Sequence, residues 1–279
     1  MSEFLEALGD PNIPFLFYAL WAGVLASVAL GIVGTYVVTR RISYIAGAIS
    51  HSVLGGIGAA LYLKTVYHLD WCDPMYGAVV AALASALIIG LVSLYAKQRE
   101  DTVIGALWAA GMAVGLLFFA KTPGYTDPMS YLFGNILLIS PDDLKRIVAL
   151  DALVVGMGVI FYHKFLAICF DPEFAELRGI RVKSYYLLLL CLTALTVVLL
   201  MRVVGIVMVI AMLTLPAAVA GHFVRRLWEM MIVSVVCCVS FTVVGLGISY
   251  QYDLPSGPVI IVLAAVVYLI VALGRRLKR

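Results

Sequence analysis

The chain has 279 residues, of which 64% are hydrophobic and only 13% charged, and its net charge is +3. Soluble domains are about 45–50% apolar and about 25% charged, so this composition excludes an ordinary soluble protein. The mean hydropathy of +1.08 indicates the same. A span takes about 20 residues, so roughly nine spans would leave only short loops. The composition therefore argues against a nucleic-acid binder, a secreted disulfide scaffold, and a kinase or nucleotidase domain.

The apolar runs predict an all-α, polytopic transmembrane protein with about nine spans, built as a single domain over residues 1–279. Eight spans are possible, because the boundary near 201–222 is the weakest. The predicted spans are 13–38, 44–63, 75–96, 102–120, 147–163, 184–201, 203–222, 229–249 and 257–274. Residues 131–139 are also apolar, but nine helical residues rise only about 14 Å and cannot cross a core of about 30 Å. We therefore expect a short surface or re-entrant helix near 129–139.

The basic residues predict the orientation of the spans. With the N-terminus outside, fourteen of the 19 Lys and Arg residues fall in inside loops. Cytoplasmic loops carry an excess of Lys and Arg, so we expect an N-out, C-in topology. The five cysteines show no metal-binding or redox spacing. We expect them to be small apolar side chains.

Ionisable side chains are almost absent from the predicted spans: Asp151 is the one acidic residue in the interior of a span, and Glu229 lies at an inner boundary. Carriers driven by protons or sodium usually need ionisable groups at membrane depth, so this distribution argues against such a carrier. His51 lies well inside the second span. An imidazole there is unfavourable unless it is paired or lines an aqueous cavity. Two interpretations stay open: His51 is a pathway residue, or it is hydrogen-bonded to a neighbouring helix.

The inside loop that follows the fifth span contains the signals of a short helix. Asp171 can cap the N-terminus, with Pro172 in the first helical position and Glu173 in the first turn. Gly179 can end the helix at its C-terminus. These signals predict a cytoplasmic helix near 171–179 that displays Phe174, Leu177 and Arg178. It is either a plain surface helix or a docking helix for a cytoplasmic partner.

Proline and glycine mark other special positions in the spans. Pro216 interrupts an apolar run and predicts a kink, which is either a gating hinge or a static bend. Gly111 and Gly115 form a small-xxx-small pair, and three glycines (Gly55, Gly56 and Gly58) crowd the second span. Close helix packing is the favoured interpretation. Room for a transport pathway beside the second span is the alternative.

Several motifs occur in order along nearly the whole chain. They are Arg40-Arg41-Ile42-Ser43, Ser50-His51-Ser52-Val53-Leu54, Ser130-Tyr131-Leu132-Phe133-Gly134-Asn135-Ile136-Leu137, Phe170-Asp171-Pro172-Glu173-Phe174-Ala175 through Gly179, Val204-Gly205-Ile206, Leu215-Pro216-Ala217-Ala218 and Asp253-Leu254-Pro255-Ser256-Gly257. Together they resemble the permease subunit of the ABC importers that take up zinc, manganese or iron with a soluble binding protein.

The resemblance implies a multi-pass permease domain in the cytoplasmic membrane of a prokaryote, which acts as a homodimer with a second copy or as one of a pair of permeases. A cytoplasmic ABC ATPase would drive alternating access, and an extracytoplasmic metal-binding protein would deliver the ion. The chain itself would be no enzyme and would bind no permanent cofactor or nucleic acid. The divalent metal is its substrate, ATP binds the partner subunit, and lipid surrounds the spans.

The resemblance also implies site residues. His51 corresponds to a metal-transit residue, and we expect Ser50, Ser52 and Gly47 to lie along the pathway. Pro216 is the candidate hinge. The residues that correspond to the coupling helix are Asp171, Glu173, Phe174, Ala175, Leu177, Arg178 and Gly179. The chain departs from the family at Gly47, where the family commonly has an aspartate one turn before the histidine. Loss of that carboxylate disfavours manganese more than zinc.

Other functions stay open on the sequence alone. A stand-alone channel or secondary carrier would transport without ATP, and the 171–179 helix would then have no docking role. An intramembrane enzyme or assembly factor is disfavoured, because no paired His/Glu metal motif and no nucleophile–base pair is present in the sequence. The metal itself, whether zinc, manganese, iron or a chelate, is not determined by these residues.

Overall fold

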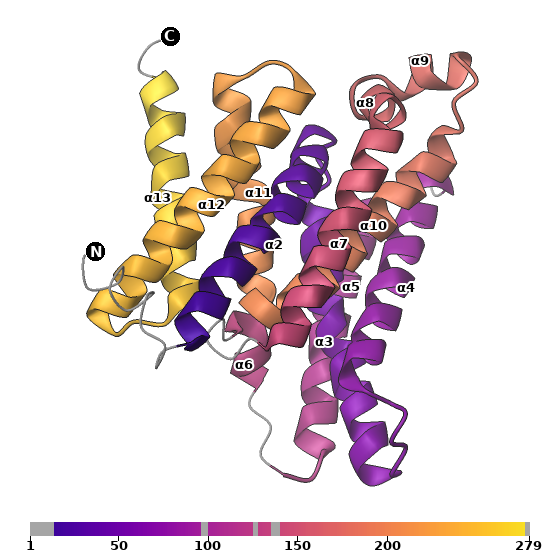
Figure 1. Ribbon diagram of the computed structural model, residues 1–279. Helices are drawn as coiled ribbons and strands as arrows, with labels where there is room; N and C mark the ends of the chain where they lie inside the picture. Colours follow the sequence, from indigo (N-terminus) through magenta and orange to yellow (C-terminus); the bar gives the residue numbers. More distant parts are fainter. Residues whose placement is uncertain (1–13, 96–99, 125–127, 135–139, 277–279) are drawn as a thin grey trace. The chain divides into compact units, whose positions relative to one another are not determined.

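A computed structural model describes residues 14–95, 100–124, 128–134 and 140–276, and these form helices joined by short turns (Figure 1). The helices are α2 (Pro14–Thr39), α3 (Ser43–Val66), α4 (Pro74–Tyr95), α5 (Glu100–Lys121), α6 (Pro128–Phe133), α7 (Pro141–Ile160), α8 (Tyr162–Phe170), α9 (Pro172–Leu177), α10 (Val182–Val204), α11 (Ile206–Phe223), α12 (Leu227–Tyr252) and α13 (Ser256–Arg276). No strand occurs within these ranges. The all-α prediction is confirmed.

Among the described residues, eight helices are long and apolar enough to cross a membrane. They are α2, α3, α4, α5, α10, α11, α12 and α13. A ninth crossing results if α7 and α8, which meet at a bend of 72°, form one span. The polytopic prediction is therefore confirmed, but the uncertain crossing is the predicted span 147–163. The predicted span 203–222 is secure, because α11 qualifies by itself.

The predicted short helix near 129–139 is confirmed only in its first part. Helix α6 covers Pro128–Phe133, and six residues are far too few to span a membrane. Residues 135–139 lie outside the described ranges. Between α10 and α11 the chain passes through Gly205 with a φ of 81°, so the break falls at a glycine three residues beyond the predicted position.

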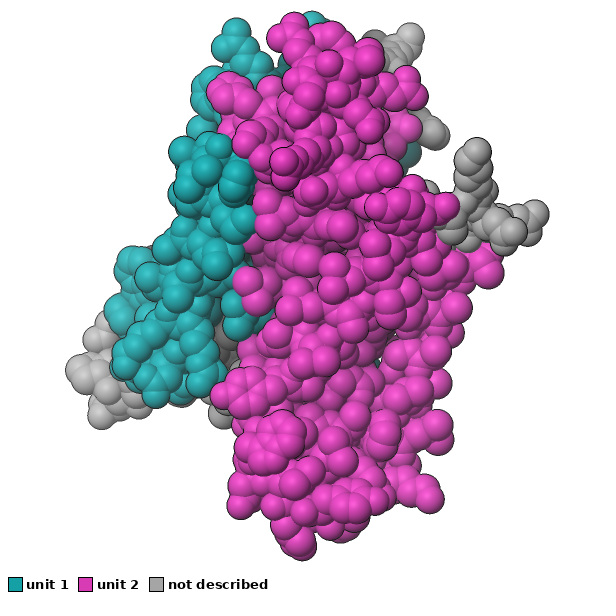
Figure 2. Space-filling model, turned by 90° about the vertical axis from the view of Figure 1, so that its right-hand side faces the viewer, with its two compact units in different colours: residues 1–38, 132–161, 199–279 teal, residues 39–131, 162–198 magenta. Residues whose placement is uncertain are grey.

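The helices group into two compact units (Figure 2). One unit contains residues 39–131 and 162–198, and α3 packs there against both α4 and α5. Glycines allow this packing: a Cβ on Gly56 would lie 2.1 Å from the carbonyl oxygen of Gly77 in α4. A Cβ on Gly55 would lie 2.8 Å from that of Gly111 in α5. The close-packing interpretation of these glycines is confirmed.

The other unit contains residues 1–38, 132–161 and 199–279. Its helices α11, α12 and α13 pack against one another, and glycines again set the separation of α2 from two of them. A Cβ on Gly34 would lie 2.2 Å from the carbonyl oxygen of Leu213, and one on Gly31 would lie 2.5 Å from the Val235 side chain. Small residues therefore let backbones approach closely in this unit too.

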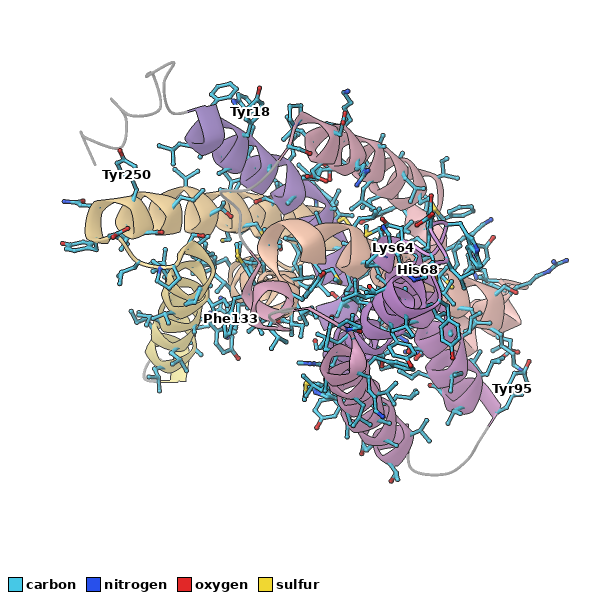
Figure 3. All side chains as sticks on the ribbon, turned by 90° about the horizontal axis from the view of Figure 1, so that it is seen from below. Tyr18, Lys64, His68, Tyr95, Phe133 and Tyr250 are labelled. Carbon is cyan, nitrogen blue, oxygen red and sulfur yellow. The ribbon has the colours of Figure 1, made fainter. Side chains whose placement is uncertain are left out.

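Three further glycines meet where α6 ends, at Phe133 (Figure 3). Gly134 has a φ of 65° and Gly205 a φ of 81°, which L side chains rarely adopt. A Cβ on Gly205 would lie 2.2 Å from the carbonyl carbon of Phe133, and one on Gly257 would lie 2.9 Å from its oxygen. Phe133-Gly134, Gly205 and Gly257, which come from three of the sequence motifs, therefore form a backbone junction.

Candidate functional site

His51 lies in the middle of α3 and faces α5. Its imidazole stacks on the indole ring of Trp108, with ring centroids 4.7 Å apart and planes inclined by 18°. Its Nδ1 atom is buried and has no hydrogen-bond partner among the described residues. The alternative, in which His51 forms a hydrogen bond to a neighbouring helix, is thus not supported for Nδ1. The ring keeps a donor atom for a ligand.

Gly47 lies one turn before His51 and contacts the same indole ring. A Cβ at position 47 would lie 2.9 Å from Cζ3 and 3.1 Å from Cη2 of Trp108. The indole therefore fills the space that a side chain at position 47 would need. Sequence reasoning missed Trp108; its position three residues before Gly111, on the face of the small-xxx-small pair, was the available signal.

The two serines beside His51 have their hydroxyl hydrogens engaged. Ser50 is fully buried and donates to the carbonyl oxygen of Ala46 at 2.7 Å. Ser52 lies within hydrogen-bond distance of the carbonyl oxygens of Ala48, at 2.8 Å, and of Leu107 in α5, at 3.2 Å. Ser52 therefore helps to join α3 to α5, and Ser50 supports its own helix.

The described residues contain no group of three or more His, Cys, Asp or Glu side chains that could hold a metal ion. One chain offers a single imidazole at this position, and divalent transition metals prefer several N, O or S donors. The structure therefore brings together His51, Gly47 and Trp108. It does not assemble a complete coordination sphere from the described residues.

Other ionisable side chains have local structural partners or lie away from this site. The Nδ1 atom of His222 lies 2.8 Å from the carbonyl oxygen of Ala218, four residues earlier on the same helix. Lys64 and His68 lie together where α3 ends (Figure 3). Asp151 is buried in α7, where its Oδ1 accepts a hydrogen bond from the Ala29 amide of α2 at 3.1 Å.

The predicted helix of the 171–179 segment is present as α9. The side chain of Asp171 accepts a hydrogen bond from the Phe174 amide at 2.9 Å, and Pro172 occupies the first turn. Gly179 follows with a φ of 78°, so a left-handed residue ends the helix as expected. The local signals in the sequence therefore determine this helix.

Helix α9 presents apolar side chains to its surroundings. Leu177 is 87% exposed and Phe174 is 51% exposed, and the guanidinium of Arg178 lies 4.9 Å from the centre of the Phe174 ring. Ala175 is buried, and α9 packs against α8. Glu173 lies in the first turn, where its charge is favourable. The helix can therefore offer an apolar contact without losing its own anchorage.

Pro216 lies inside α11 and is buried. A proline has no amide hydrogen, so the carbonyl four residues earlier, that of Met212, loses its helical donor. The thiol of Cys238 in α12 donates to this oxygen at 3.6 Å. Cys238 is therefore more than the apolar filler expected from the sequence, because it satisfies the carbonyl that the proline leaves free.

Comparison with known proteins places this arrangement in a family. The model of the ABC 3 transport family matches residues 12–275. The chain belongs to this family. The match covers every described helix except the last residue of α13, so the resemblance seen in the motifs is confirmed.

Named relatives cover almost the whole chain. A "Probable metal transport system membrane protein" of Chlamydia trachomatis is 39% identical over 267 residues, which are 95% of this chain and 90% of the relative. The "Manganese transport system membrane protein MntC" of Listeria monocytogenes is 31% identical over 96% of this chain and 92% of its own.

A solved structure is similar over the same extent. The structure of PsaBC from Streptococcus pneumoniae in complex with Fab superposes with a TM-score of 0.84 and 31% identity, over 97% of this chain and 94% of the other. With the spans described above, the family match makes this chain a multi-pass membrane transport protein of a prokaryote.

Proposed function

We propose that the chain is the permease subunit of an ATP-driven importer for divalent transition-metal ions, with His51 as a transit ligand. The observation that carries the proposal is the buried, unpartnered Nδ1 of His51 within a membrane-spanning helix. Ionisable groups at this depth are costly and mark substrate pathways. The names of the relatives from Chlamydia trachomatis and Listeria monocytogenes support metal as the substrate.

The chain supplies binding and movement, and other proteins supply the energy. A cytoplasmic ATPase subunit docks on α9, where Leu177 and Phe174 provide the exposed apolar contact. ATP binding and hydrolysis on that subunit drive alternating access. An extracytoplasmic binding protein delivers the ion, and a second copy of this chain brings a second His51 to the pathway. Pro216 in α11 is the proposed hinge.

The donor set favours an ion that accepts nitrogen. A neutral imidazole suits zinc, iron and other later transition metals, whereas manganese prefers carboxylate oxygens. Gly47 supplies no carboxylate, and Trp108 occupies the space beside it. The Listeria relative carries manganese in its name, so both ions belong in the test.

The proposal predicts that His51→Ala abolishes metal uptake while the amount of folded protein is unchanged. Cells that lack their own high-affinity zinc importer would express the chain with its ATPase and binding protein, and uptake of radioactive zinc would be measured with and without excess manganese. His222→Ala is the matched control, because His222 contacts its own helix backbone. Normal uptake in His51→Ala would refute the transit role. Uptake into proteoliposomes without ATP would instead indicate a stand-alone channel or carrier.

A further inference from the structure

Trp108 occupies an unusual place in the contact between α3 and α5. The two helices run in the same direction, and α5 faces α3 with Gly111 and Gly115. A Cβ on Gly111 would lie 2.6 Å from Cα of Ser52, and one on Gly115 would lie 2.7 Å from the Leu54 backbone. One turn earlier, the same face of α5 carries Trp108, whose side chain is the largest of all. The close contact of the two helices therefore gives way to a bulky ring beside His51.

The backbone of α5 is fixed next to Trp108. The hydroxyl of Ser52 lies 3.2 Å from the carbonyl oxygen of Leu107, the residue before the tryptophan. Gly111 contacts the Ser52 backbone three residues later. Because both flanking positions are held against α3, the rotation of α5 about its axis is set. The indole is thereby directed at the face of α3 that carries Gly47 and His51.

The indole ring also contacts two other residues of α3. Gly47 lets Cζ3 and Cη2 approach α3 more closely than a methyl group at this position would allow without a shift of the ring. The ring of Tyr44 lies 5.7 Å away, inclined by 52°. Trp108 thus contacts three successive turns of α3, at Tyr44, Gly47 and His51. A ring held in this way provides a fixed surface for its neighbours.

Stacking on this surface leaves the imidazole able to bind a ligand. With centroids 4.7 Å apart and planes inclined by 18°, the indole covers a face of the imidazole. The nitrogen lone pairs lie in the plane of the imidazole and point away from its faces, so stacking restricts rotation of the ring without blocking coordination. A ligand that is oriented in advance binds more tightly, because less freedom is lost on binding.

We propose that Trp108 is the positioning residue of the metal-transit site and that Gly47 is the residue that makes room for it. The indole holds the imidazole of His51 in the plane in which it meets the ion. This inference rests on the proposed function, in which His51 contacts the metal. It also gives a reason for glycine at position 47. From the sequence alone, Gly47 was notable only because the family commonly has an aspartate there.

The test is zinc binding to the full-length chain in lipid nanodiscs, measured by competition with a chromophoric chelator. Trp108→Ala should weaken His51-dependent binding about two- to tenfold, the equivalent of one aromatic stacking contact. Trp108→Phe keeps an aromatic face and should restore binding to within about twofold of the unmodified chain. This rescue separates positioning from a general loss of packing.

Gly47→Ala provides a second variant that should fold. Its methyl group would meet the far end of the indole, which can shift by a few tenths of an ångström and leave the imidazole unsupported. Binding should weaken as in Trp108→Ala. Gly105→Ala is the matched control on α5, because a Cβ there meets nothing within 4 Å, and it should bind zinc as the unmodified chain does.

The outcomes separate the two claims. If His51→Ala binds zinc normally, or if the unmodified chain shows no His51-dependent binding, the transit site itself is wrong and the positioning role falls with it. If His51→Ala loses binding but Trp108→Ala and Gly47→Ala keep full affinity, the transit site stands and the positioning role is refuted. Equal weakening by Gly105→Ala would also refute it.

Discussion

Cys238 and Pro216 show how one residue can compensate for another within a membrane helix bundle. The proline leaves the carbonyl of Met212 without its helical donor, and the thiol of Cys238 lies 3.6 Å from that oxygen. Hydrogen bonds between membrane helices contribute about 0.6 kcal/mol on average. The contribution is small, but a buried carbonyl in a lipid environment has no water as an alternative partner.

We expect Cys238→Ala to lower the free energy of unfolding of the purified chain by about 1 kcal/mol, a value that includes the lost sulfur contacts. Cys238→Ser keeps a donor and should lose less. The decisive measurement is a double-mutant cycle in detergent, because Pro216→Ala restores the amide donor. In the Pro216→Ala chain, Cys238→Ala should lower the free energy of unfolding by less than it does in the unmodified chain. Strict additivity would show that the thiol does not serve the carbonyl. Cys237→Ala is the control on the same helix.

At the scale of the element, α9 combines secure local structure with an exposed apolar surface. Its N-terminus is capped by Asp171, its C-terminus is ended by Gly179, and Ala175 anchors it. Leu177 contributes little to this framework, because 87% of the residue is exposed. A change at Leu177 therefore separates docking from folding better than a change at Phe174, whose ring contacts Arg178.

Leu177→Asp should abolish ATP-dependent uptake, because it would place a charge in the apolar contact with the ATPase subunit. The chain should still reach the membrane and unfold at an unchanged temperature. Co-purification of the ATPase subunit should fall in parallel. Leu177→Met should behave as the unmodified chain. Tyr252→Asp is the control that places the same charge at another exposed residue, 66% exposed, on the predicted opposite side. Normal uptake and ATPase co-purification in Leu177→Asp would refute docking on α9.

For the whole molecule, the number of membrane crossings depends on whether α7 and α8 together form one span. The two helices meet at a bend of 72°, and the chain crosses nine times if they form a span and eight times if they do not. The count decides topology: with nine crossings, the segment before α7 and the segment after α8 lie on opposite sides. With eight they lie on the same side, and the predicted C-in terminus moves outside.

We expect nine crossings with N-out, C-in topology, because this arrangement places fourteen of the 19 Lys and Arg residues inside. Cysteine labelling in intact spheroplasts tests it. In chains that carry a single cysteine, either Cys72 or Lys121→Cys should react with a membrane-impermeant maleimide. Arg181→Cys should react only after permeabilisation. Labelling of Lys121→Cys and Arg181→Cys from the same side would show that α7 and α8 do not form a crossing.

Much of the fold could be predicted because lipid imposes simple rules on the chain. Eight predicted spans correspond to single helices, since a span needs a long apolar run with satisfied backbone groups. The ends of α9 were predictable from Asp171 and Gly179, because caps act within a few residues. The bend at Phe161 was not, because residues 147–163 form one apolar run without proline.

The candidate site was predictable only in part. The depth of His51 in a span made it a candidate pathway residue, with a hydrogen bond to a neighbouring helix as the alternative, and the motif around it indicated the family. The sequence could not show that Trp108, more than fifty residues later, stacks on its ring, nor that Ser52 bonds to Leu107. The pairing of Cys238 with the Met212 carbonyl was hidden for the same reason.

Composition, the lengths of the apolar runs and capping signals determined by themselves that this protein is a polytopic, membrane-spanning α-helical protein with a short capped helix in its longest predicted inside loop. These features depend on hydrophobic matching to the bilayer and on hydrogen bonds between near neighbours, which a linear sequence displays directly. The tertiary structure decided which faces of the helices meet. It placed Trp108 over Gly47 and His51 because close packing through glycines fixes the rotation of each helix about its axis, and that rotation depends on contacts between residues far apart in the chain.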